Sequence, residues 1–129
     1  MYRFMQGLIA NRVLLVDDNP SLRRSLRLRL ERAGIEVAEA ENGLDGIGMA
    51  LGYRPRVIIL DFRMPEMNGL EVAPQLKRLL PRSFIILFTM HSTDVLETEA
   101  QKLGVTAVVS KDRAGIDLLP QAERLLAAW

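Results

Sequence analysis

Three aspartates in this chain come directly after short apolar stretches. Asp17 and Asp18 follow residues 13–16, and Asp61 follows residues 57–60. Carboxylates that crowd together repel one another, so a group of them calls for a cation. Hard oxygen ligands with no histidine or cysteine beside them favour Mg²⁺, which binds one or two carboxylates and keeps several waters. An aspartate that stands on a separate strand can also act as a nucleophile toward phosphorus and form an aspartyl phosphate.

Two further polar residues follow apolar stretches in the same way. Thr89 comes after residues 84–88, and Lys111 comes shortly after residues 105–109. A lysine adds a point charge and a threonine adds a hydroxyl donor for the oxygens of a phosphoryl group, whose in-line transfer needs little else from a protein. Each such residue taken singly is more often a turn, a cap or a solvated side chain. Only their conjunction predicts a phosphoryl-transfer site.

The elements that would bring these residues together alternate along the chain. Helical patterns of roughly ten residues or more separate the apolar runs, which is long enough for right-handed crossovers between parallel strands. Several runs are almost continuously apolar, as expected for strands covered on both faces. The five predicted strands occupy residues 13–16, 35–38, 57–60, 84–88 and 105–109. The sequence therefore predicts an α/β fold of five strand–helix units, (βα)₅, arranged as a doubly wound three-layer sandwich.

Parallel strands end at one common edge of their sheet. If the strand order is 2-1-3-4-5, the strands that precede Asp17, Asp61, Thr89 and Lys111 are neighbours. Ligands of doubly wound sheets bind at this edge, where the strand order reverses. The order therefore predicts that all four side chains meet in one cleft.

Capping residues predict the first helix. Asn19 followed by Pro20 is typical of a helix N-cap and first residue, and Gly34 is typical of a helix end. The buried stripe of this helix is expected to consist of Leu22, Leu26, Leu30 and Ala33.

Later boundaries depend on a glycine and two prolines. Gly104 is predicted to close the fourth helix. Pro74 should weaken or kink the third helix, and Pro120 predicts that the last helix begins only near Asp117.

Composition narrows the functional classes. A chain of 129 residues, 49% hydrophobic and 26% charged, suits one globular domain and is too apolar for disorder. A net charge of +1 gives no field that favours nucleic acid or membrane, and the absence of cysteine removes disulfides and thiolate sites. No apolar run reaches the roughly 18 residues of a membrane span. Residues 1–10 are interpreted as a tail or lead-in strand, and a cytoplasmic location is expected.

The stretch from Asp61 to Glu71, DFRMPEMNGLE, carries the most specific motif. It matches the pattern D-x-x-M-P-x-M-x-G, and the chain from about residue 11 onward resembles the receiver domains of response regulators in two-component signalling systems. The resemblance implies a flavodoxin-like fold over residues 11–129. It also implies a phosphoacceptor switch in two-component or phosphorelay signal transduction, which is not a conventional enzyme but assists its own phosphorylation and dephosphorylation.

The resemblance also implies a role for each site residue. Asp61 would be the phosphoacceptor, Thr89 the switch hydroxyl and Lys111 the phosphate-contacting lysine. Ligands of Mg²⁺ would be the carboxylates of Asp17, Asp18 and Asp61 and the main-chain carbonyl of Arg63. The implied partner is a sensor histidine kinase or a histidine phosphotransfer protein. Related regulators often add a DNA-binding domain, but this chain is expected to make no direct contact with nucleic acid or membrane; a homodimer stays open.

Several positions depart from the family pattern. Val108 occupies the position three residues before the lysine, where the family usually has an aromatic residue. In the family that aromatic side chain swings inward as the threonine moves toward the phosphoryl group. Valine is small and stiff at χ1, so we expect a muted or altered conformational response. Asp112 replaces a proline after the lysine, which leaves the geometry of the Lys111–Asp112 peptide open. Met90 replaces a smaller residue and narrows the approach to the site. Arg63 is predicted to cover the phosphoryl group or to be solvated.

Arginines crowd the first predicted helix. Together with Leu28 they are predicted to dock an acidic partner helix, against the alternative of an ordinary solvated face. They are Arg23, Arg24, Arg27, Arg29 and Arg32. His91, the single histidine, is interpreted as a loop or rim residue rather than a phosphorelay histidine.

Three other functions are compatible with parts of the sequence. A phosphorylation-independent interaction module on the same fold is favoured slightly by Val108 and Met90. A hydrolase of the haloacid-dehalogenase type would need a second aspartate two residues after Asp61, where this chain has Arg63. A flavin-binding module would need a phosphate-cradling loop, whereas Asp17 and its neighbour Asp18 would repel a flavin phosphate.

Overall fold

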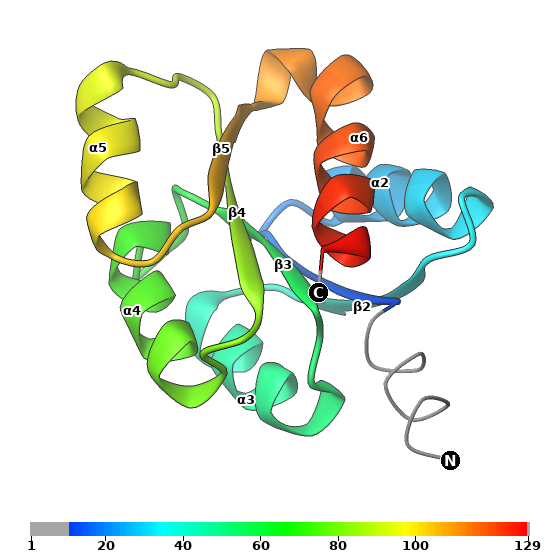
Figure 1. Ribbon diagram of the computed structural model, residues 1–129, viewed down its shortest axis with the longest axis horizontal. Helices are drawn as coiled ribbons and strands as arrows, with labels where there is room; N and C mark the ends of the chain where they lie inside the picture. The colour runs from blue at the N-terminus through cyan, green and yellow to red at the C-terminus, as the bar shows by residue number, and fades with distance from the viewer. Residues whose placement is uncertain (1–10, 129) are drawn as a thin grey trace.

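The computed structural model describes residues 11–128, so the expectation for residues 1–10 lies outside the described part of the chain. Its five strands form one parallel sheet in the order β2-β1-β3-β4-β5, as predicted (Figure 1). The strands are β1 (Arg12–Val16), β2 (Glu36–Ala40), β3 (Val57–Asp61), β4 (Phe84–Thr89) and β5 (Ala107–Ser110). The helices are α2 (Pro20–Arg32), α3 (Gly43–Tyr53), α4 (Gly69–Leu79), α5 (Asp94–Lys102) and α6 (Ala114–Ala127), with a short 3₁₀ helix η1 (Lys111–Arg113) before α6.

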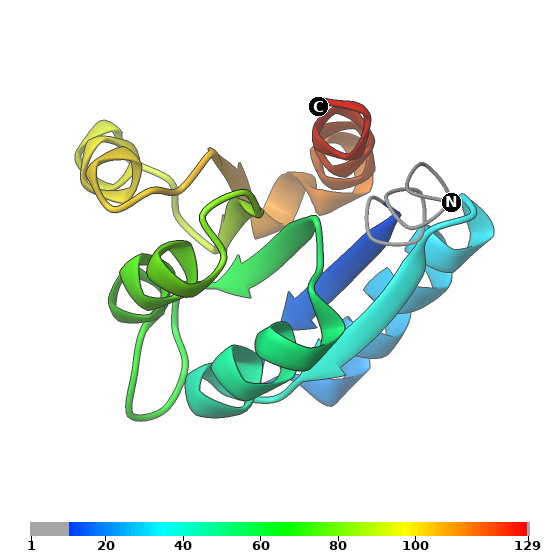
Figure 2. The same ribbon diagram turned by 60° about the horizontal axis from the view of Figure 1, so that its bottom comes forward.

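The helices cover both faces of the sheet, which gives the predicted three-layer sandwich (Figure 2). Successive side chains of a strand point to opposite faces. Accordingly, Val13 and Leu15 of β1 pack with residues of α2 and α6, whereas Leu14 and Val16 pack with residues of α3, α4 and α5. All residues of β3 are buried, as are all but the first of β4. This explains why these strands appear in the sequence as continuous apolar runs.

Helix α2 begins and ends where its capping residues predict. The Asn19 side chain accepts hydrogen bonds from the first amides of the helix, and Pro20 is the first helical residue. Gly34 adopts φ +83° after the helix, in the left-handed region that favours glycine. The expectation that Ala33 is buried is wrong, because it lies at the C-cap and is exposed. Ile35, whose amide bonds back to the Leu30 carbonyl, fills that place in the core instead.

Two prolines lie inside helices, and one of the two predictions that rested on them is wrong. Helix α6 begins at Ala114, so the prediction of a start near Asp117 is wrong. Pro120 cannot donate to the carbonyl of Ile116, but both residues are exposed and water can bond to that carbonyl. Pro74 lies inside α4, which still forms one helix from Gly69 to Leu79.

Two other boundaries bear on the site. Gly104 follows the end of α5 with φ +97°, as predicted. Strand β2 extends two residues beyond its predicted end and so includes Glu39, which lies opposite Leu15 in the register of β1 and β2. Within residues 11–128, no helix is long and apolar enough to cross a membrane.

Candidate functional site

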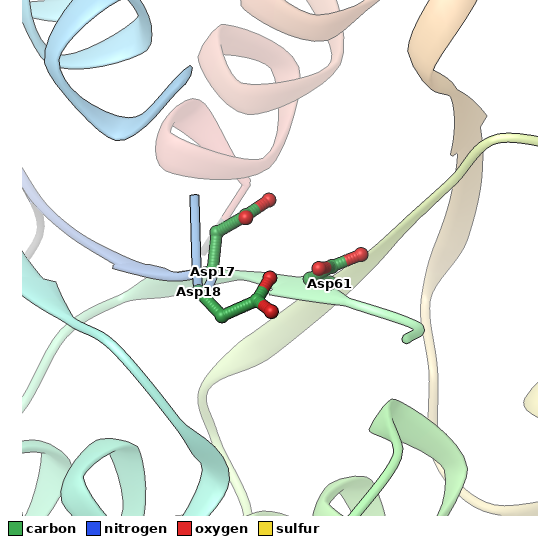
Figure 3. A group of neighbouring side chains, drawn as sticks. All are labelled: Asp17, Asp18 and Asp61. Atoms are coloured by element: carbon green, nitrogen blue, oxygen red, sulfur yellow. The ribbon is translucent and has the colours of Figure 1, made fainter. Parts of the chain in front are cut away.

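Three carboxylates gather at the C-terminal edge of the sheet (Figure 3). Asp61 is the last residue of β3, and Asp17 and Asp18 directly follow the neighbouring strand β1. One oxygen of each carboxylate lies within 4.8 Å of the others. Asp17 and Asp61 are each only 3% exposed, whereas Asp18 is exposed. The structure thus brings together the three aspartates that the sequence singles out.

Lys111 faces this cluster from the first residue of η1, directly after β5. Its Nζ lies 3.0 Å from Oδ1 of Asp61 and 3.3 Å from Oδ2 of Asp17. The ammonium also lies 5.5 Å from the ring centre of Phe88, where a cation is attracted to the aromatic face. Lys111 therefore holds its charge beside the two buried carboxylates.

Burial and charge shift the titration of Asp61. Burial, followed by the nearby Asp17 carboxylate, raises the pKa of Asp61 from 3.8 to about 6, although Lys111 and the Arg63 amide act in the opposite direction. Burial alone would lower the pKa of Lys111, but its contacts with Asp61 and Asp17 outweigh burial and raise that pKa. Asp61 is consequently ionised near neutral pH, but its ionised form is less favoured than that of an exposed aspartate.

The donor atoms of the cluster fit a small divalent cation. Among residues 11–128, the three carboxylates have one ammonium in contact with the cluster, that of Lys111, so the cluster keeps an excess of negative charge. Oδ2 of Asp17 is buried and accepts no hydrogen bond of good geometry from the described residues. A buried acceptor of this kind normally has a partner. Oxygen ligands alone are what Mg²⁺ prefers, so the set fits the predicted ion.

Main-chain amides orient the two buried carboxylates. The Asn19 amide donates to Oδ1 of Asp17 at 2.9 Å, and the Arg63 amide donates to Oδ1 of Asp61 at 3.3 Å. Arg63 itself is exposed, and its carbonyl as a metal ligand stays a prediction. These two bonds each come from the residue two positions later, so the turns that follow β1 and β3 fix the aspartate side chains.

Gly69 of the sequence motif is required by close packing under Asp61. A Cβ at position 69 would lie 2.7 Å from the Asp61 carbonyl oxygen and 2.7 Å from Cδ1 of Leu87. The Gly69 amide also donates to the Phe62 carbonyl at 2.7 Å. The glycine therefore lets α4 begin directly against the end of β3.

Thr89 ends β4 and is 4% exposed. Its hydroxyl contacts the main chain of His91, donating to the carbonyl at 3.3 Å and accepting from the amide at 3.4 Å. In the sheet register Thr89 lies opposite Ser110, the residue before Lys111. Thr89 thus ends β4 and Lys111 directly follows the neighbouring strand β5, as predicted. His91 is exposed, in accord with its interpretation as a rim residue.

The positions that depart from the motif lie around this edge. Val108 is half-buried and packs on the core between the sheet and α3, α4 and α5. Met90 is 57% exposed. The Lys111–Asp112 peptide is trans, and the Asp112 carboxylate accepts a hydrogen bond from the Ser110 hydroxyl. The loop after β5 is therefore tied by a side-chain contact that proline could not make.

Sequence reasoning missed the partners of the arginines on α2. Arg23 and Arg27 both bind Glu39 of β2, and Arg23 also donates to the Asp17 carbonyl. Only part of the predicted docking surface is therefore free of such contacts: Leu28 is 49% exposed, and Arg24 is exposed. Glu39 lies beyond the predicted end of its strand, so no signal in the sequence indicated this pairing.

The fold and the cluster together define a flavodoxin-like α/β domain with an acidic cluster, paired with a lysine, at its switch point. The sequence model of the family described as the response regulator receiver domain matches residues 13–123, so the chain belongs to that family. The recognition made from the sequence motif is confirmed. The chain is therefore a receiver domain of the kind that acts as a signalling switch.

Individual relatives agree with this membership. A putative transcriptional regulator from Pseudomonas aeruginosa is 33% identical over 120 residues, which cover 92% of this chain and 58% of the relative. The structure of CheY4, a chemotaxis protein of Vibrio cholerae, matches with a TM-score of 0.83 and 29% identity over 88% of this chain and 97% of that one. TrrA of Thermotoga maritima, solved in complex with Mg²⁺–BeF, matches with a TM-score of 0.81 and 30% identity over 89% and 98% of the two chains. The chain spans about half the length of the first curated transcriptional regulators that it matches.

Proposed function

We propose that this receiver domain takes a phosphoryl group from a phosphohistidine of a partner onto the carboxylate of Asp61, with Mg²⁺ bound. The observation that carries the proposal is the position of Asp61: it is buried, 3.0 Å from the Lys111 ammonium, and shares an acidic cluster with Asp17 and Asp18. A carboxylate in this position is both a nucleophile and a group whose new phosphoryl charge meets cations immediately.

The transfer is an in-line displacement at phosphorus. An oxygen of the Asp61 carboxylate forms a bond to phosphorus as the bond between phosphorus and the imidazole nitrogen of the donor breaks, and the imidazole keeps that electron pair. The product is an acyl phosphate. Hydrolysis by water later returns the carboxylate and inorganic phosphate. The domain supports both steps without being a conventional enzyme.

The remaining residues of the site position and neutralise charge. Asp17, Asp18 and Asp61, with the carbonyl of Arg63, would hold Mg²⁺, which supplies positive charge for the phosphoryl oxygens. Lys111 would turn from the carboxylate oxygens that it now contacts to an oxygen of the phosphoryl group. The Thr89 hydroxyl, which now contacts only the main chain of His91 among the described residues, would donate to another.

The partner is proposed to be a sensor histidine kinase or a histidine phosphotransfer protein, because these are the phosphohistidine donors expected for a member of the receiver family. We place this exchange in the cytoplasm and assign it to residues 11–129 as one receiver unit. A homodimer is compatible with this function. Nucleic-acid contacts by the receiver itself are not part of the proposal.

Mass spectrometry after incubation with acetyl phosphate and Mg²⁺ tests the proposal. The intact protein should gain the mass of one phosphoryl group, the gain should require Mg²⁺, and Asp61→Asn should abolish it. Glu41→Gln, which removes an exposed carboxylate, is the matched control and should gain the same mass as the unchanged protein.

The alternative function is a phosphorylation-independent interaction module. The specific observation in its favour is Val108, a half-buried residue packed against the core at the position where the family usually has an aromatic residue. The same experiment separates the two functions, because the interaction module predicts no mass gain with acetyl phosphate and Mg²⁺.

A further inference from the structure

A chain of charged contacts connects α2 and β2 to the acidic turn after β1. Nε of Arg23 lies 2.9 Å from Oε1 of Glu39, and NH1 of the same guanidinium donates to the Asp17 carbonyl at 2.6 Å. Arg27 binds the other oxygen of Glu39 at 2.7 Å. Hence a single planar group of Arg23 spans from the strand β2 to the main chain of a candidate metal ligand.

These contacts are better protected from solvent than ordinary surface ion pairs. The side chains of Arg23 and Glu39 are 15% and 25% exposed. Burial works to raise the pKa of Glu39, but hydrogen bonds from Arg27 and Arg23 outweigh it, so that this pKa is lowered and the carboxylate stays ionised. Guanidinium-to-oxygen bonds of this kind are directional and stronger than neutral ones.

The bond to the Asp17 carbonyl acts on the backbone at the point where β1 ends. The Asp17 amide still belongs to the sheet, donating to the Ala40 carbonyl at 3.1 Å, whereas the Asn19 amide turns back to the Asp17 carboxylate. The peptide between Asp17 and Asp18 sits between these two bonds, and Arg23 holds its carbonyl. Rotation of this peptide would move both acidic side chains.

We propose that Arg23, held by Glu39, is a positioning residue that fixes the Asp17–Asp18 peptide so that the acidic pair is preorganised for a divalent cation. The inference deepens the proposed function and rests on it for the identity of the ion. Arg23 has two opposite effects on cation binding. As a nearby positive charge Arg23 weakens cation binding, whereas as a clamp on the Asp17 carbonyl it strengthens cation binding.

The test measures Mg²⁺ binding itself, by following amide chemical shifts of the intact chain during titration with MgCl₂. Arg23→Gln removes the charge and the clamp. Arg23→Lys keeps the charge but has no planar fork to bind Glu39 and the Asp17 carbonyl together. Arg27→Gln is the matched control, because it removes a positive charge from the same glutamate without touching Asp17.

Both Arg23 variants should weaken Mg²⁺ binding roughly tenfold, the usual size of an effect from a residue that orients a metal ligand. Arg27→Gln should stay within about twofold of the unchanged protein. Without any metal, the Asn19 amide should exchange its hydrogen faster in the Arg23 variants than in Arg27→Gln, because the turn that it closes is less constrained.

Equal or tighter Mg²⁺ binding by Arg23→Gln would overturn the inference, since it is the result expected from charge alone. Full affinity in Arg23→Lys, or an equal loss in Arg27→Gln, would overturn it as well. If the unchanged protein binds no Mg²⁺ at millimolar concentration, the proposed function fails together with the inference. If the unchanged protein binds Mg²⁺ and the variants match it, only the inference fails.

Discussion

Replacing Asp61 with asparagine should stabilise the fold near neutral pH in the absence of divalent cations. Asp61 is 3% exposed and belongs to the same cluster as the Asp17 carboxylate. Burial and then Asp17 raise its pKa from 3.8 to about 6, in spite of the Lys111 ammonium. Asparagine has nearly the same shape, so the substitution removes the buried charge without leaving a cavity.

The size of this effect follows from the same pKa. A displacement of one pKa unit corresponds to about 1.4 kcal/mol, so the rise from 3.8 to about 6 destabilises the folded protein by about 3 kcal/mol at pH values well above 6. The folded state binds the proton more tightly than the unfolded state. The penalty is therefore complete above the folded pKa and fades as the pH falls toward 3.8, leaving about 1 kcal/mol near pH 4.5.

Urea unfolding followed by circular dichroism measures this difference. The Asp61→Asn variant should exceed the unchanged protein by up to about 3 kcal/mol near pH 7.5 in EDTA, and the gap should narrow near pH 4.5. Glu41→Gln, at an exposed position, should change little at either pH. A variant that is less stable than the unchanged protein, or a gap that is equal at both pH values, would refute the reasoning.

Four further predictions test other parts of the site. Gly69→Ala should lower the free energy of unfolding by about 1–3 kcal/mol in urea, because the new Cβ meets Asp61 and Leu87; an unchanged midpoint would contradict the close packing. With a phosphoryl mimic, amide shifts should stay small in β4 and β5 because of Val108; large shifts throughout both strands would refute a muted response. Arg63→Ala should change the lifetime of the acyl phosphate, and an equal lifetime would mean that the exposed side chain is merely solvated. Leu28→Asp should slow phosphotransfer from the partner protein but not phosphorylation by acetyl phosphate; equal slowing of both would assign the effect to the site rather than to docking.

The fold was predictable from the sequence because its signals are local and agree with one another. Buried parallel strands appear as apolar runs, and residue type alone predicts the helix ends at Asn19, Gly34 and Gly104. The boundaries failed where packing decides them. Pro120 does not prevent a helix that starts at Ala114, because both Pro120 and Ile116, the residue whose carbonyl loses its donor, are exposed and water can take the donor's place.

The convergence of the aspartates was predictable for a different reason. All strands of a parallel sheet end at the same edge, so the residue after each strand is placed by topology alone. The pairing of Arg23 with Glu39 was not predictable in this way. It depends on how far β2 extends and on which face of α2 turns toward it, neither of which follows from residue type.

The energetics of the cluster suggest why such a site can serve as a switch. With Asp61 ionised, three carboxylates lie beside one ammonium in the described part of the chain, and the folded protein is less stable than it would be with a neutral residue at position 61. A bound cation would relieve this repulsion and would stabilise the folded state the more, the more tightly it binds. Under the proposed function, a phosphoryl group on Asp61 would change the same balance again, because it would offer Lys111 and Thr89 new acceptors. A conformational response would then originate in charge at the sheet edge, and we expect the stiff Val108 to limit how much of it reaches the surface through β5.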